Sequence, residues 1–71
     1  MAFDFVVQRL QIGDVILVDR PDRSGQVEAT VTRDIERTDT GVRVTLRLEG
    51  SSDDVVREWA IGAMVTVVRG P

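Results

Sequence analysis

Two adjacent segments of alternating polarity, residues 26–36 and 42–49, constrain the fold of this chain more than any other feature. Apolar residues occupy odd positions in the first segment and even positions in the second. They are Val27, Ala29, Val31 and Ile35, followed by Val42, Val44, Leu46 and Leu48. Successive side chains of a strand point to opposite faces of a sheet, so this period of two indicates strands with one buried face each. The two segments therefore predict a long β-hairpin.

The turn of this hairpin is predicted at residues 38–41, Thr-Asp-Thr-Gly. Both apolar sets share one face only if odd residues stand opposite even ones, and pairing Arg37 with Val42 satisfies this condition. The loop then ends at Gly41, and we expect a positive φ there because glycine tolerates one. The same register predicts three further cross-strand pairs, namely Glu36–Arg43, Ile35–Val44 and Val31–Leu48.

Two arginines, Arg33 and Arg37, break the pattern because they fall on the apolar parity of the first arm. An isolated buried arginine is very costly, so either a bulge shifts the parity or the hairpin extends past the core. We favour the second interpretation. It divides the hairpin into a stem that belongs to the core, residues 27–31 with Leu46 and Leu48, and an exposed tip, residues 33–43.

Shorter strands are expected on both sides of the hairpin. Residues 15–18 form a continuous apolar run, typical of a strand covered on both faces. Residues 55–61 and 64–69 read as the last two strands, and loops rich in turn formers occupy residues 19–25 and 49–54. On one parity of the first of these late strands stand Val55, Arg57, Trp59 and Ile61.

The first eleven residues fit two interpretations. Phe3, Phe5 and Val7 alternate with less apolar neighbours, as in a strand, whereas Phe3, Val6, Val7 and Leu10 also fit the face of a short helix. We favour an extended lead-in or edge strand in which Phe3 and Phe5 cap the open end of a small core. A strand that augments the sheet of a second copy is the alternative.

Composition restricts the chemistry. A chain of 71 residues with 42% hydrophobic residues predicts one globular domain, residues 1–71. It contains neither cysteine nor histidine, so a thiolate metal site, a cysteine nucleophile and a Ser-His-Asp triad are not available. We expect no enzyme activity and no cofactor or metal, and we read Asp14 as a residue that bonds the local backbone of its turn.

Nothing in the sequence predicts a membrane or secreted protein. No apolar run approaches the roughly 18–20 residues that span a bilayer, and no secretory signal is visible at the N-terminus. The expectation is a small acidic cytoplasmic protein, with a net charge of −3 and arginine as its only basic residue type.

About five short strands around a central hairpin predict an all-β fold, a single small antiparallel barrel. The segment Leu10–Val18, with Gly13-Asp14 before an apolar run, resembles the opening of many SH3-like barrels, including KOW and Tudor-like modules. Residues 57–68 are similar to the end of those domains, where a short turn joins the last two strands. The resemblance implies an SH3-like fold and no particular activity. An OB-like barrel is the structural alternative.

Two functions fit such a domain. We rank protein–protein interaction or homo-oligomerisation first, because arginines around an apolar residue suit an interface. Nucleic-acid binding is the alternative, since many SH3-like barrels bind RNA or DNA. A basic footprint with stacking aromatics is normally required for it, and this chain is acidic with one tryptophan. The candidate binding residues are Arg33, Ile35, Arg37, Arg43, Arg47 and Trp59. The partner, the oligomeric state and the pathway stay open.

Overall fold

The computed structural model describes residues 2–71, which form seven β-strands and one 3-10 helix. In chain order the elements are β1 (Phe3–Val6), η1 (Val7–Arg9), β2 (Val15–Asp19), β3 (Gln26–Val31), β4 (Glu36–Arg37), β5 (Val42–Leu48), β6 (Asp54–Trp59) and β7 (Met64–Arg69). The expected all-β fold is confirmed. Within residues 2–71, no helix has the length and hydropathy needed to cross a membrane.

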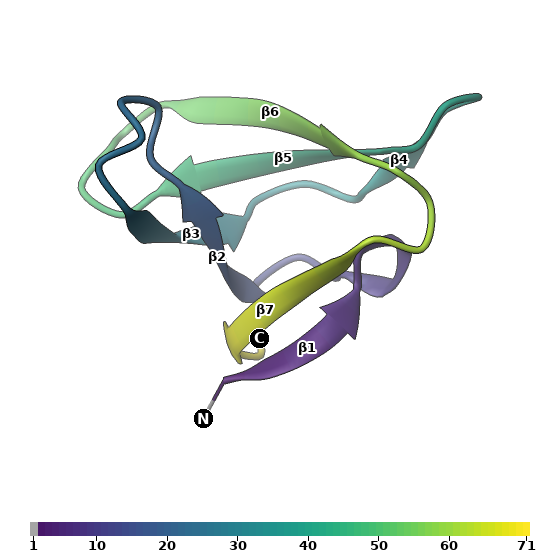
Figure 1. Cartoon of the computed structure of the whole chain (residues 1–71), viewed down its shortest axis with the longest axis horizontal. Helices are drawn as coiled ribbons and strands as arrows, with labels where there is room; N and C mark the ends of the chain where they lie inside the picture. The colour runs from purple at the N-terminus through teal and green to yellow at the C-terminus, as the bar shows by residue number, and fades with distance from the viewer. Residues whose placement is uncertain (1) are drawn as a thin grey trace.

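One antiparallel sheet contains all of these strands, in the order β1-β7-β2-β3-β5-β4, with β6 on the other edge of β5. The sheet curls into a half-barrel in which β6 and β7 lie on opposite sides (Figure 1). The predicted small antiparallel barrel is therefore confirmed in outline. It has more strands than the about five expected, because the N-terminal segment adds β1 and the first hairpin arm is divided into β3 and β4.

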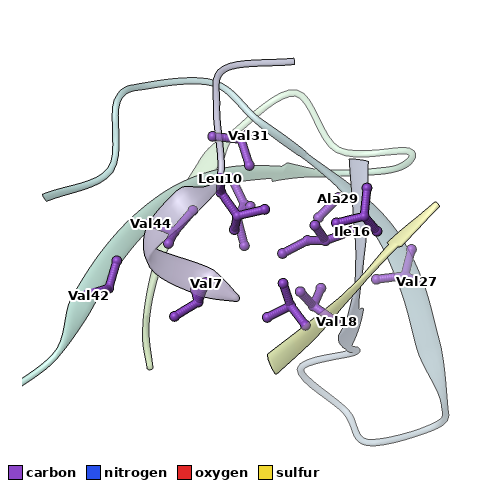
Figure 2. Close-up of a cluster of buried hydrophobic side chains, with 12 residues drawn as sticks. Val7, Leu10, Ile16, Val18, Val27, Ala29, Val31, Val42 and Val44 are labelled. Carbon is purple, nitrogen blue, oxygen red and sulfur yellow. The ribbon is translucent and has the colours of Figure 1, made fainter. Parts of the chain in front are cut away.

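The inner face of the sheet holds a core made mostly of valine (Figure 2). Its largest fully buried side chains are Ile16 and Leu46, neither of which has any exposed surface. The inward positions predicted for the stem, Val27, Ala29 and Val31, are all buried. A core of small β-branched side chains suits a strongly curled sheet, in which the two sides lie close together.

The register of the hairpin is correct at the tip and wrong in the stem. Glu36 faces Arg43 and Arg37 faces Val42, as predicted. Val31, however, faces Leu46, while Leu48 faces Ala29. The two ends of the hairpin are therefore paired in registers that differ by two residues.

A bulge in the first arm accounts for this difference. The amide of Thr32 donates to the carbonyl of Thr45 over 3.1 Å, which continues the stem register. From there to the Glu36–Arg43 pair the first arm has three residues, 33–35, whereas the second arm has only Val44. This bulge adds two residues and leaves the parity unchanged, so it is not the parity-shifting bulge considered as the alternative. Arg33 lies within it and is exposed to solvent.

The expected division into buried stem and exposed tip is wrong for the second arm. Val42 and Val44 have no exposed surface, although Val42 lies in the part assigned to the tip and Val44 directly follows it. They are covered because β6 pairs with β5 along this length and because Val7 of η1 belongs to the same core cluster (Figure 2). Arg37 is exposed, as expected.

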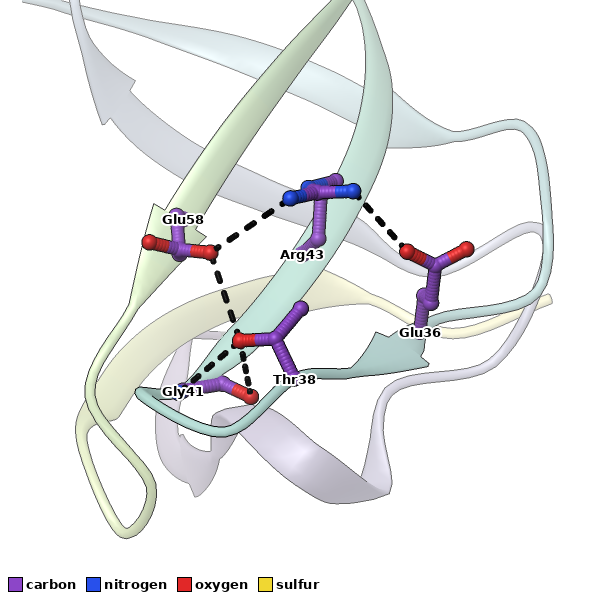
Figure 3. A network of polar contacts seen from close by, with 5 residues as sticks. All are labelled: Glu36, Thr38, Gly41, Arg43 and Glu58. Carbon is purple, nitrogen blue, oxygen red and sulfur yellow. Dashed lines mark hydrogen bonds and ion pairs between the residues drawn. The ribbon is translucent and has the colours of Figure 1, made fainter.

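Gly41 is required for a reason other than the one predicted. Its φ lies outside the positive region, so the turn does not depend on left-handed backbone. A Cβ atom at this position would instead lie 2.1 Å from the carbonyl oxygen of Trp59. The turn itself is closed by Thr38, whose hydroxyl accepts from the Gly41 amide at 3.1 Å (Figure 3).

The N-terminal segment combines the two interpretations. Residues 3–6 form the expected edge strand, which pairs with β7, and residues 7–9 add one helical turn. Met1 lies outside the described residues. Phe5 packs against the core, and the half-exposed Phe3 meets its ring edge-on at a centroid distance of 5.9 Å.

Two turn predictions can be compared with the structure. The carboxylate of Asp14 accepts from the amide of Gln11 at 2.8 Å, so its role in the local backbone is confirmed. The strand expected over residues 55–61 ends at Trp59, and the turn at residues 60–63 leaves Ile61 54% exposed. The predicted strand was therefore two residues too long at its C-terminal end.

Candidate functional site

Two of the predicted binding residues, Arg43 and Arg47, lie on the outer face of β5 and are paired with carboxylates. The Arg43 guanidinium lies 2.9 Å from Glu36 and 4.0 Å from Glu58 (Figure 3). Arg47 lies 2.9 Å from Asp54. Exposed pairs of this kind contribute about 0–1 kcal/mol each. Their positive charge is nevertheless locally balanced, which makes this face a poor attractor for anions.

Three further predicted residues lie in or beside the bulge. Arg33 and Arg37 are exposed, while Ile35 is half-buried and packs against the core. Ile35 therefore presents only part of its side chain between the two arginines. Their role in binding stays a prediction.

Trp59, the last predicted residue, stands at the end of β6 opposite Val42. Its side chain is half-buried and packs against the core, so it occupies the core edge. The exposed part faces a groove that the sequence did not reveal.

This groove lies where the half-barrel stays open. β2 pairs with β7 only at Val15 and Ile16, with a register shift between them, and β6 pairs only with β5. Two adjoining hollows of about 580 and 300 Å³ occupy the opening and share Asp19, Gln26 and Arg57 as lining residues. We call them together the seam groove.

The two ends of the seam groove differ in chemistry. One end is lined by Arg20, Arg23 and Arg57, and none of these arginines forms an ion pair with a carboxylate of residues 2–71. The other end is lined by Trp59 and Met64, and Met64 is 58% exposed. The groove therefore joins a cationic end to an apolar end.

Arg57 connects these ends. It stands opposite the fully buried Val44, on the inward parity of β6, yet its Nη2 donates to the carbonyl oxygen of Asp19 over 3.1 Å. An inward-pointing charge on an edge strand discourages pairing with other chains, and that role alone could explain an arginine here. The guanidinium also reaches the rim of the groove, where a ligand can contact it.

The loop that carries Arg20 and Arg23 is held by its own backbone. The amide of Arg20 donates to the Gly25 carbonyl over 2.8 Å, and that of Arg23 donates to the Arg20 carbonyl over 2.9 Å. Arg23 has a φ of 60°, a conformation that costs a non-glycine residue about 1–2 kcal/mol. Such strain persists only where the surroundings fix the backbone, so the two arginines are presented by an ordered loop.

Asp22 fixes the same loop by accepting from the Ser24 amide at 3.0 Å. The Ser24 side chain, followed by this amide, lowers the pKa of Asp22 from the ordinary value of 3.8. A lowered pKa means that the ionised form favours the folded loop, so the contribution is present above the ordinary value and is lost as the pH falls through the folded-state pKa.

We therefore expect an NMR titration of the Asp22 carboxyl to give a midpoint below 3.8, with the Ser24 amide signal moving at the same midpoint. Asp22→Ala removes the acceptor and serves as the control, because its Ser24 amide should show no such transition. A midpoint at or above 3.8 would contradict the hydrogen-bonded loop.

The sequence-based search missed Arg20, Arg23 and Arg57, because β2, the following loop and β6 meet only through the curl of the sheet. One signal was present, namely a charged residue at position 57 among inward-facing neighbours. As for metals, residues 2–71 contain no cluster of three or more His, Cys, Asp or Glu side chains arranged to hold an ion.

Comparisons with protein-family models, with curated proteins and with solved structures find no match to this chain. The residues and geometry of the groove therefore have to support any functional assignment.

Proposed function

We propose that this chain is a non-catalytic, SH3-like interaction module that binds a protein partner through the seam groove. The proposal depends on one observation: a single open groove is lined by a half-buried tryptophan and by three arginines that form no ion pair within residues 2–71. Arginine and tryptophan are, with tyrosine, the side chains enriched at the energetic centres of protein interfaces.

The strand order supports the SH3-like assignment. β2, β3 with β4, β5 and β6 follow one another as antiparallel neighbours, and β7 then returns to pair with β2. These strands occupy five consecutive positions in one curled sheet. Five consecutive antiparallel strands are the layout of the SH3-like barrels whose opening the segment Leu10–Val18 resembles. β1 is an addition to that layout, on the far edge of β7.

A binding role is favoured by what the groove residues can do. Arginine, tryptophan and methionine contact and orient ligands, whereas the chain has no histidine or cysteine to serve as base or nucleophile near neutral pH. Of the carboxylates that line the groove, Asp19 borders both hollows and Glu58 borders only the smaller one.

Selection of peptides from a random phage-displayed library on the folded domain tests this proposal. We expect enriched peptides that bind the wild-type domain and lose binding to Arg57→Gln, which removes a groove charge. Arg9→Gln is the matched control, because it removes the same charge from an exposed position outside the groove and should leave binding unchanged.

Two results would overturn the proposal. One is the absence of any enriched peptide, and the other is enrichment of peptides that bind the wild-type and Arg57→Gln domains equally. Tight binding of generic RNA or DNA at physiological salt, with no peptide selected, would favour the nucleic-acid alternative.

A further inference from the structure

We infer that the ligand of the seam groove is an extended acidic segment of a partner protein, in which a carboxylate side chain and an apolar side chain stand two residues apart. This inference rests on the proposed function and names the ligand class for the same groove. The carboxylate binds between the arginines, and the apolar side chain packs against Trp59 and Met64.

The charge of the groove selects an anion. Three arginines and one aspartate line the larger hollow, which gives it a formal charge of +2 on a chain whose net charge is −3. Within residues 2–71, the one hydrogen bond of the Arg57 guanidinium is the Nη2 contact to Asp19, so its Nε and Nη1 donors are available to a ligand. A guanidinium binds a carboxylate through two parallel hydrogen bonds, which gives geometric selectivity as well as attraction.

The spacing of the groove selects an extended chain. Arg57 and Trp59 are two residues apart on the same face of β6, so they are separated by about 6.6–6.8 Å along the strand. An extended peptide repeats its side chains on one face with this same period. A segment that lies along the groove therefore meets Arg57 and Trp59 with side chains at positions i and i+2.

The surroundings favour a single carboxylate over a nucleic acid. A nucleic acid carries a phosphate at every nucleotide, and its binding depends on several basic contacts along the strand. Beyond Arg57 the groove is lined by Glu58 and by no further arginine. On the outer face of the neighbouring strand, Arg43 and Arg47 are already paired with carboxylates. The groove thus accepts one isolated anion and repels a continuous series of them.

Fluorescence titration tests the inference, because Trp59 is the only tryptophan of the chain and reports directly on the groove. The probes are two end-blocked peptides, Ser-Glu-Ser-Leu-Ser and Ser-Gln-Ser-Leu-Ser, which differ in one carboxylate. We expect the glutamate peptide to bind about tenfold more tightly, as is ordinary for a hydrogen bond to a charged group. The difference should shrink as salt is added, because the groove is open to solvent.

Variants locate the carboxylate. Arg57→Gln and Arg23→Gln should each reduce the affinity for the glutamate peptide by about tenfold and should leave the affinity for the glutamine peptide unchanged. Arg9→Gln, which removes the same charge elsewhere, should not affect either peptide. Arg23 is an exposed loop residue, so its variant remains informative if Arg57→Gln lowers stability.

The possible outcomes separate the two proposals. If the wild-type domain bound both peptides equally and the Arg57→Gln domain bound neither, the acidic ligand would be overturned. The groove would then remain a protein-binding site. Phage-display selection of groove-binding peptides that lack Asp and Glu would likewise overturn the acidic ligand and leave the groove as a protein-binding site. Binding that survives both arginine variants would overturn the groove itself. Displacement of the glutamate peptide by a single-stranded RNA oligonucleotide at a lower concentration would overturn the choice of a protein ligand.

Discussion

Replacement of Gly41 by alanine is expected to lower the free energy of unfolding by about 3 kcal/mol, near the upper end of what overpacking usually costs. The added Cβ would lie 2.1 Å from the Trp59 carbonyl oxygen and 3.1 Å from its carbonyl carbon. These are backbone atoms of β6, so no side-chain rotation relieves the contact. Either the turn at residues 38–41 or the end of β6 must move. Urea denaturation followed by Trp59 fluorescence measures the loss.

Gly70→Ala is the matched control for this prediction. It makes the same substitution at a glycine that also has an ordinary φ, and its Cβ would meet nothing nearer than Asp14 Oδ1 at 3.8 Å. We expect a change within about 0.5 kcal/mol, as for most surface substitutions. If Gly41→Ala were as stable as Gly70→Ala, the close approach of the turn to β6 would be refuted.

Leu46→Ala is expected to destabilise the domain by about 2–5 kcal/mol, the usual range for truncation of a buried leucine. Leu46 has no exposed surface and stands at the centre of the sheet, between Val31 of β3 and Val55 of β6. A total stability of about 0.05–0.15 kcal/mol per residue amounts to roughly 4–11 kcal/mol for a chain of this length. The variant should therefore lose a large share of its stability and unfold at a much lower urea concentration.

Val56→Ala provides the comparison for the core truncation. Val56 lies on the neighbouring strand β6, but its side chain is 57% exposed on the outer face. We expect a loss within about 0.5 kcal/mol. A cost for Leu46→Ala similar to that of Val56→Ala would show that β5 is not the centre of the core.

The alternation of apolar and polar residues was sufficient to predict the all-β class and most of the inward side chains, because a strand buried on one face places an apolar residue at every second position. The tip pair Glu36–Arg43 followed from parity and from the length of the turn. The stem register did not follow, because a shift of two residues leaves every side chain on its original face and so leaves no trace in the pattern.

The candidate groove was beyond sequence-based prediction for a different reason. Arg23 belongs to a loop and Arg57 to a strand, and they meet at one opening because the second half of β2 does not pair with β7. The reason for Gly41 was hidden in the same way, since the atom that excludes a side chain belongs to Trp59, eighteen positions further along the chain. Both depend on how distant strands approach one another, which polarity alone does not encode.

The bulge at residues 33–35 also sets a rule for changes in the length of the hairpin. It contains two residues more than the opposing arm, and the pairs on its two sides, Val31–Leu46 and Glu36–Arg43, do not depend on its length. Opposed residues share a face, and the turn at residues 38–41 keeps Glu36 opposite Arg43, so a change of one residue within the bulge also leaves Glu36 on the outer face. Insertions and deletions of one or two residues at this point are therefore expected to spare the core, whereas a one-residue change in the turn would shift the pairing of β4 with β5.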